Sequence, residues 1–162
     1  MSRFMLKQRW FSLGDSYAVR DAANEEVLRI RGKVFSIGHQ LAVQDMSGSE
    51  LALIDQKLLH WGPTYEIWRH GRLAAVVKKA VFTLLHCTFT VDVPGPDDLI
   101  AEGNFWENEY TFRRRGQRVA SVSREYFTWT DTYGIDVPHG EDPILIIASA
   151  VVIDLCCHGD QR

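Results

Sequence analysis

Apolar and polar residues alternate in short stretches along most of this chain. Such a period of two is typical of strands with one buried face. Alternating apolar pairs recur at regular intervals: Tyr17/Val19, Leu41/Val43, Tyr65/Ile67, Tyr110/Phe112 and Tyr133/Ile135. The pattern therefore predicts a mainly β protein built from a repeated unit.

The repeated unit is about fifteen residues long and begins every 22 to 24 residues. Copies occupy residues 7–21, 31–45, 55–69, 78–92 and 123–137, with a weaker copy at 100–114. Five copies carry a large apolar residue at their fifth place: Phe11, Phe35, Leu59, Phe82 and Phe127. Turn-prone Gly14-Asp15, Gly38-His39 and Gly62-Pro63 follow in the first three copies. A shared plan of this length predicts a hairpin in each copy.

Further apolar segments lie between the copies, after turn signals. They are residues 27–31, 51–54, 73–77 and 119–122, which follow residues such as Asn24, Gly48, Gly71 and Gly116. Six units of two strands give about twelve short antiparallel strands. A propeller or an open sandwich would also fit this period.

The C-terminal segment favours a barrel over these alternatives. Asp142 is a suitable N-cap, and Pro143 suits the first helical position. The helix should run from Pro143 to Cys157 or His158, with Gly159 as its C-cap. Its apolar residues surround the axis, so it should be buried on every side. A closed barrel of about twelve strands is too wide for strand side chains alone to fill, and a helix fits its interior. We therefore predict a closed antiparallel barrel of six hairpins around a central helix.

Composition supports one globular domain spanning residues 1–162, because 46% of the residues are apolar and 24% are charged. The net charge of −3 argues against nucleic acid as a partner. Three cysteines, Cys87, Cys156 and Cys157, make a poor disulfide framework and indicate a reducing compartment. Without a signal peptide at the N-terminus, we expect a cytoplasmic protein, peripheral at a membrane if it binds one.

The chain resembles the LURP-one-related family, whose fold is shared with tubby C-terminal domains and related to phospholipid scramblases. The resemblance rests on residues 5–9, 56–59, 91–99 and 148–154 and extends over almost the whole chain, which looks like a small single-domain prokaryotic member. It implies a twelve-stranded barrel around a C-terminal helix. Tubby relatives bind phosphoinositide head groups through basic residues on the barrel wall, but their lipid-binding motif does not match this sequence.

Basic residues provide the candidate ligand site. The densest positive runs are Lys78-Lys79 and Arg113-Arg114-Arg115, with Arg118 close behind. Because alternate residues of a strand point outward, Lys79 and one set of neighbours could form a patch on the outer wall. Such a patch would suit anionic phospholipid head groups. The alternative interpretation is a solvated hairpin edge, where basic side chains guard against edge pairing.

Other polar residues favour structural roles. Asp154 should be buried and held by an arginine, lysine or tryptophan N–H of the wall. The cysteines lack metal-ligand spacing, and the acidic residues between Asp92 and Glu109 do not follow an EF-hand pattern, so we predict no metal and no cofactor.

Two functions remain open at this point. The first is a non-enzymatic binding or scaffold module that recognises an anionic phospholipid or a protein partner through its outer wall. The second is a small enzyme or ligand carrier with a rim pocket near Trp61, Trp106 or Trp129. An exposed tryptophan at one barrel end would be a contact for a ligand or a membrane.

Overall fold

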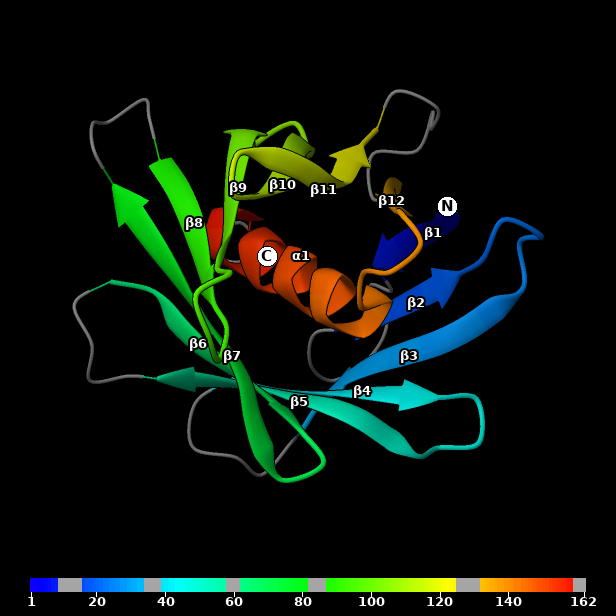
Figure 1. Ribbon diagram of the computed structural model, residues 1–162. Helices are drawn as coiled ribbons and strands as arrows, with labels where there is room; N and C mark the ends of the chain where they lie inside the picture. The colour runs from blue at the N-terminus through cyan, green and yellow to red at the C-terminus, as the bar shows by residue number, and fades with distance from the viewer. Residues whose placement is uncertain (9–15, 34–38, 58–61, 82–86, 125–131, 159–162) are drawn as a thin grey trace.

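The computed structural model describes residues 1–8, 16–33, 39–57, 62–81, 87–124 and 132–158 (Figure 1). Its elements are β1 (Ser2–Gln8), β2 (Ser16–Arg20), β3 (Glu26–Gly32), β4 (Gln40–Asp45), β5 (Glu50–Lys57), β6 (Thr64–Arg69), β7 (Arg72–Val81), β8 (Cys87–Asp92), β9 (Leu99–Asn104), β10 (Glu109–Arg114), β11 (Gln117–Ser123), β12 (Thr132–Val137) and α1 (Pro143–His158). The apolar fifth-place residues of the repeat, together with Trp10, Trp61, Trp129 and Gly159, lie outside the described residues.

Each strand pairs antiparallel with its neighbours along the chain, and β1 pairs with β12 to close the ring. The predicted closed barrel of twelve strands is therefore confirmed. Tight hairpins join several pairs: His70 and Gly71 both have positive φ between β6 and β7, as do Arg115 and Gly116 between β10 and β11. Two successive positive φ values produce the turn twist that matches a right-handed β-ribbon.

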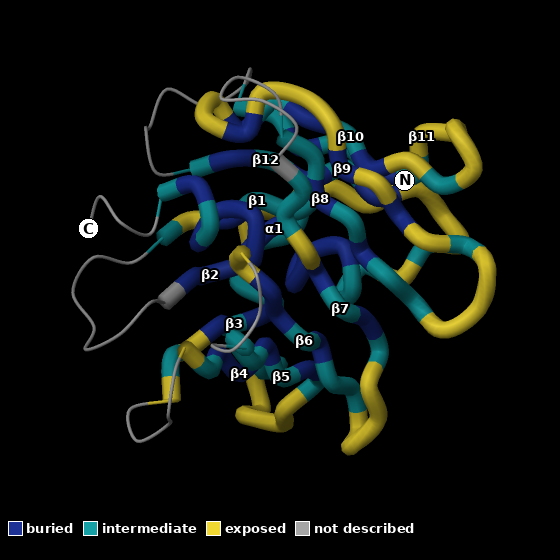
Figure 2. Tube along the Cα trace, turned by 90° about the vertical axis from the view of Figure 1, so that its left-hand side faces the viewer, coloured by how far each residue is buried: buried dark blue, intermediate teal, exposed yellow. Residues whose placement is uncertain are grey.

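The alternating apolar residues of the strands point into the barrel. Leu6, Val19, Ile54 and Ile135 are completely buried, and Tyr17 is 1% exposed. Figure 2 shows the same alternation of buried and partly exposed positions along the strands, with exposed residues gathered mainly in the connecting turns. The period-2 pattern thus predicted the inner face correctly.

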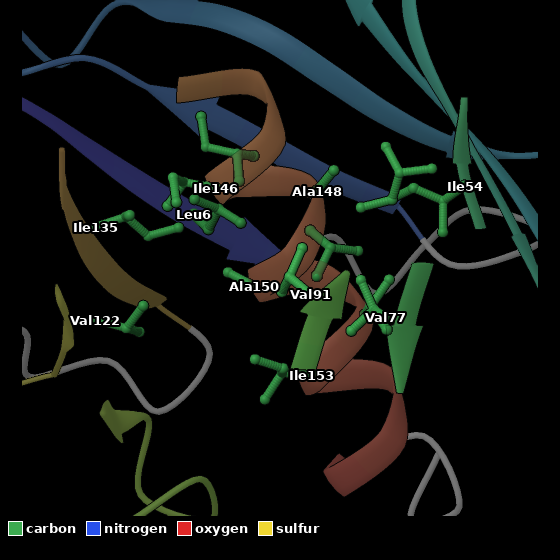
Figure 3. Packing of buried hydrophobic residues seen from close by; sticks show 14 of the residues in the cluster. Leu6, Ile54, Val77, Val91, Val122, Ile135, Ile146, Ala148, Ala150 and Ile153 are labelled. Carbon is green, nitrogen blue, oxygen red and sulfur yellow. The ribbon is translucent and has the colours of Figure 1, made fainter. Parts of the chain in front are cut away.

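Helix α1 fills the interior of the barrel (Figure 1). Every residue from Ile146 to Leu155 is buried. Figure 3 shows helix residues such as Ile146 and Ile153 facing wall residues such as Leu6 and Val91. The sixteen residues of α1 make it too short for a membrane span, and no helix in the described part of the chain could form one.

Candidate functional site

The start of α1 is fixed by its cap and by two ion pairs. The Asp142 carboxylate accepts the Ile144 N–H at 3.0 Å, which confirms Asp142 as the N-cap, and Pro143 is the first helical residue. Arg69 of β6 forms an ion pair with Asp142. The N–H groups of Arg114 Nη1 in β10 donate to both Glu141 oxygens at 2.6 and 2.8 Å. These contacts attach the segment before the helix to two separate parts of the wall.

Asp154 lies inside the barrel, near the end of α1, and is 4% exposed. The Tyr17 hydroxyl of β2 donates to its Oδ2 at 2.6 Å, and His158 Nδ1 lies 2.9 Å from its Oδ1. Among the described residues, the tyrosine and histidine contacts of Asp154 were not predicted, and the expected arginine, lysine or tryptophan partner stays a prediction. Burial and the nearby Asp154 charge raise the pKa of Tyr110 well above its ordinary value.

His158 connects this buried carboxylate to the barrel rim. Its Nε2 lies 3.1 Å from the Trp106 carbonyl oxygen, and the two rings meet edge to face with centroids 5.8 Å apart. The end of α1 is therefore attached to the turn between β9 and β10. Both imidazole nitrogens are used in this attachment.

The three cysteines are free thiols. Burial raises the pKa of Cys156 to about 12 and that of Cys157 to about 11. Such thiols stay protonated near neutral pH and are poor nucleophiles and poor metal ligands. In the described part of the chain, no cluster of histidine, cysteine or carboxylate side chains could hold a metal ion.

The two lysines of the predicted basic patch point to opposite faces of β7. Lys79 pairs with Phe89, which is completely buried, so its side chain faces the interior. Lys78 points outward, and its Nζ lies 2.9 Å from the Asp92 carboxylate. Of the two, only Lys78 contributes to the outer wall, so the prediction that Lys79 points outward is wrong, because the register of β7 puts its even-numbered Lys78 outside.

The three consecutive arginines also separate. Arg113 points outward from β10, with Glu102 at 3.8 Å. Arg114 is part-buried and holds Glu141, while Arg115 lies in the β10–β11 turn and forms an ion pair with Asp97. The last two therefore stabilise the barrel end where the helix begins.

One row of outward residues crosses five strands, from β7 to β11. The strand register pairs neighbours in the order Lys78, Thr90, Ile100, Arg113 and Arg118. We call this set the basic row. It combines three cations with an isoleucine that is 44% exposed. The sequence pattern does not place Ile100 or Arg118 in this row, because membership depends on the strand register, which spacing along the chain does not determine.

Comparison with known proteins agrees with this architecture. The family model described as LURP-one-related matches residues 2–154. A Bacillus subtilis (strain 168) relative, "Uncharacterized protein YxjI", is 28% identical over 167 residues, which cover 99% of this chain and 97% of that protein. The X-ray structure of an Arabidopsis thaliana protein has a TM-score of 0.68 at 15% identity, covering 99% of this chain and 92% of that one, which shows the shared fold. With its barrel, its central helix and a family match over nearly its whole length, the chain belongs to the LURP-one-related family.

Proposed function

We propose that this protein is a non-enzymatic binding module that recognises an anionic phospholipid surface through the basic row. The observation that carries the proposal is the pairing of Arg113 with Arg118 across β10 and β11, at a β-bulge that follows Phe112. Like charges on directly opposed residues destabilise a sheet. A phosphate group between the two guanidinium groups would remove this repulsion and form charge-assisted hydrogen bonds.

The neighbours of the arginine pair suit a membrane surface. Ile100 lies beside Arg113 in the adjacent strand and exposes 44% of its surface, so it can contact the acyl boundary. Lys78 adds a third cation two strands beyond Ile100. A carboxylate lies near each of these cations: Asp92 near Lys78, Glu102 near Arg113 and Asp136 near Arg118. The local positive charge is therefore modest, and we expect reversible, salt-sensitive binding.

The interior supports a role on the outside of the barrel. Helix α1 occupies the centre, and its residues from Ile146 to Leu155 are buried against the wall. The buried Asp154–His158 pair differs from a catalytic dyad, because His158 Nε2 faces a backbone carbonyl where a general base would face a substrate. These features favour binding over catalysis.

Vesicle flotation tests the proposal. The protein is mixed with vesicles of phosphatidylcholine alone or of phosphatidylcholine with phosphatidylserine, at low and high salt. The test variant is Arg113→Gln/Arg118→Gln. The control is Arg20→Gln/Arg31→Gln, which removes the same charge from β2 and β3, outside the basic row.

We expect recovery with the anionic vesicles only, and loss of binding at high salt. Each cation near the surface contributes about 1 kcal/mol, so the test variant should bind roughly ten- to thirty-fold more weakly. The control should stay within about twofold of the wild type. Equal recovery on both vesicle types, or equal losses in the two variants, would contradict the proposal.

A further inference from the structure

The turn between β9 and β10 presents a large aromatic side chain to solvent. Trp106 is 59% exposed, whereas its neighbour Phe105 is 2% exposed and packs against Phe89 and Tyr110. The buried Phe105 anchors the turn in the core. The indole of Trp106 therefore stands out from a fixed base.

Hydrogen bonds hold this turn in a single conformation. The Glu107 N–H donates to Asn104 Oδ1 at 3.2 Å, and Asn104 Nδ2 donates to Glu107 Oε2 at 2.9 Å. His158 contacts the Trp106 carbonyl, and its ring packs against the Trp106 ring in a T-shaped arrangement. An aromatic ring held in place in this way loses little entropy on binding, a property of interface anchors.

The surroundings of the indole are negatively charged. Glu107 is the next residue, and among the described residues no cationic side chain lies within ion-pair distance of its carboxylate. The C-terminal end of α1, which carries the negative end of the helix dipole, lies beneath Trp106.

We infer that Trp106 and Glu107 form a docking point for an arginine- or lysine-bearing segment of a partner protein. A guanidinium or ammonium group can lie on the indole face as a cation–π pair while it forms an ion pair with Glu107. Neighbouring apolar groups of the partner would cover the rest of the ring. Neither Trp106 nor Glu107 belongs to the basic row, the charge at this site is the opposite one, and the inference does not depend on the proposed membrane function.

A short arginine peptide is a direct probe. Binding of a capped hexa-arginine peptide to the full chain is measured by calorimetry at low salt, with a capped hexa-glutamate peptide as the opposite-charge control. The variants are Trp106→Ala and Glu107→Gln. Glu25→Gln is the matched control, because Glu25 is an exposed glutamate in the β2–β3 turn without a neighbouring tryptophan.

We expect hexa-arginine to bind and hexa-glutamate not to bind. Affinity should fall about five- to tenfold in Trp106→Ala, as expected for a cation–π contact of roughly 1 kcal/mol or more. Glu107→Gln should cost about two- to fivefold, and Glu25→Gln less than about twofold. Thermal unfolding of each variant shows whether the barrel stays intact.

Several outcomes would overturn the inference. The first is that the wild-type protein does not bind hexa-arginine. The second is that a folded Trp106→Ala variant keeps the wild-type affinity for the peptide. The third is that Glu107→Gln and Glu25→Gln lose the same amount of affinity. If Trp106→Ala instead abolishes binding to phosphatidylserine vesicles and leaves peptide binding intact, the tryptophan serves the membrane and the inferred peptide site is wrong. Loss of peptide binding together with normal flotation would support this site regardless of the function of the basic row.

Discussion

Replacing Asp154 by alanine tests the polar contact between the helix and the wall. Asp154 is 4% exposed and accepts the Tyr17 hydroxyl at 2.6 Å, with His158 at 2.9 Å. A hydrogen bond to a charged group contributes about 1.5–3 kcal/mol. Removing a negative charge from the last turns of a helix returns about 0.3–1 kcal/mol, because the dipole disfavours that charge. Asp154 makes two such contacts, so the net loss should be about 2–6 kcal/mol, and we take about 3 kcal/mol as the working value.

The assay is thermal unfolding followed by circular dichroism at neutral pH. For a domain of this size, about 3 kcal/mol corresponds to a midpoint lowered by roughly 6–12 °C. Asp136→Ala is the control, because Asp136 pairs with Arg3 on the outer wall at 2.7 Å, where an ion pair contributes about 0–1 kcal/mol. A double-mutant cycle with Tyr17→Phe should give a coupling free energy of about 1–2 kcal/mol.

A stabilising role of Asp154 is refuted if Asp154→Ala lowers the midpoint no more than Asp136→Ala does. A coupling near zero in the cycle with Tyr17→Phe would show that the 2.6 Å contact adds no stability of its own. A variant that becomes more stable would mean that the unfavourable burial and dipole contributions exceed the hydrogen bonds.

Two further predictions concern the backbone and the thiols. Gly103 has φ +142°, and a Cβ at this position would lie 2.5 Å from the Glu109 carbonyl oxygen. Gly103→Ala should therefore lower the free energy of unfolding, measured by urea denaturation, by about 3 kcal/mol or more. Gly48→Ala, where a Cβ meets no atom within 4 Å, should cost only about 1 kcal/mol, and equal costs would contradict the steric argument. Burial raises the pKa of Cys156 to about 12 and of Cys157 to about 11, from an ordinary value of 9.0, so the folded state disfavours the thiolates. The contribution of the buried thiols to stability is fully present below pH 9.0 and is lost as the pH rises toward these raised pKa values. Above pH 9.0 the wild type should therefore lose stability more steeply than the double variant Cys156→Ala/Cys157→Ala. Parallel curves of stability against pH for the two proteins would disprove this linkage.

The sequence pattern predicted the inner face of the wall residue by residue. Tyr17 and Val19 are buried as their spacing indicated, and Asp142 caps the helix as its position before Pro143 indicated. These predictions succeeded because strand alternation and helix capping depend on residues a few positions apart. Period-2 alternation also requires Lys78 and Lys79 to face opposite sides of β7, so only one of the two lysines can belong to a patch on the outer wall. The register of β7 with β8 shows which one it is.

Only the tertiary structure decided which distant residues meet. Tyr17 reaches Asp154 across 137 positions, and His158 reaches Trp106 across 52. The basic row has the same origin, because Ile100 comes beside Arg113 only through the register of β9 and β10. Local pattern determines which face a side chain takes, since that depends on backbone geometry alone. Neighbours across the barrel depend on strand register and on closure around the helix, which are properties of the whole chain.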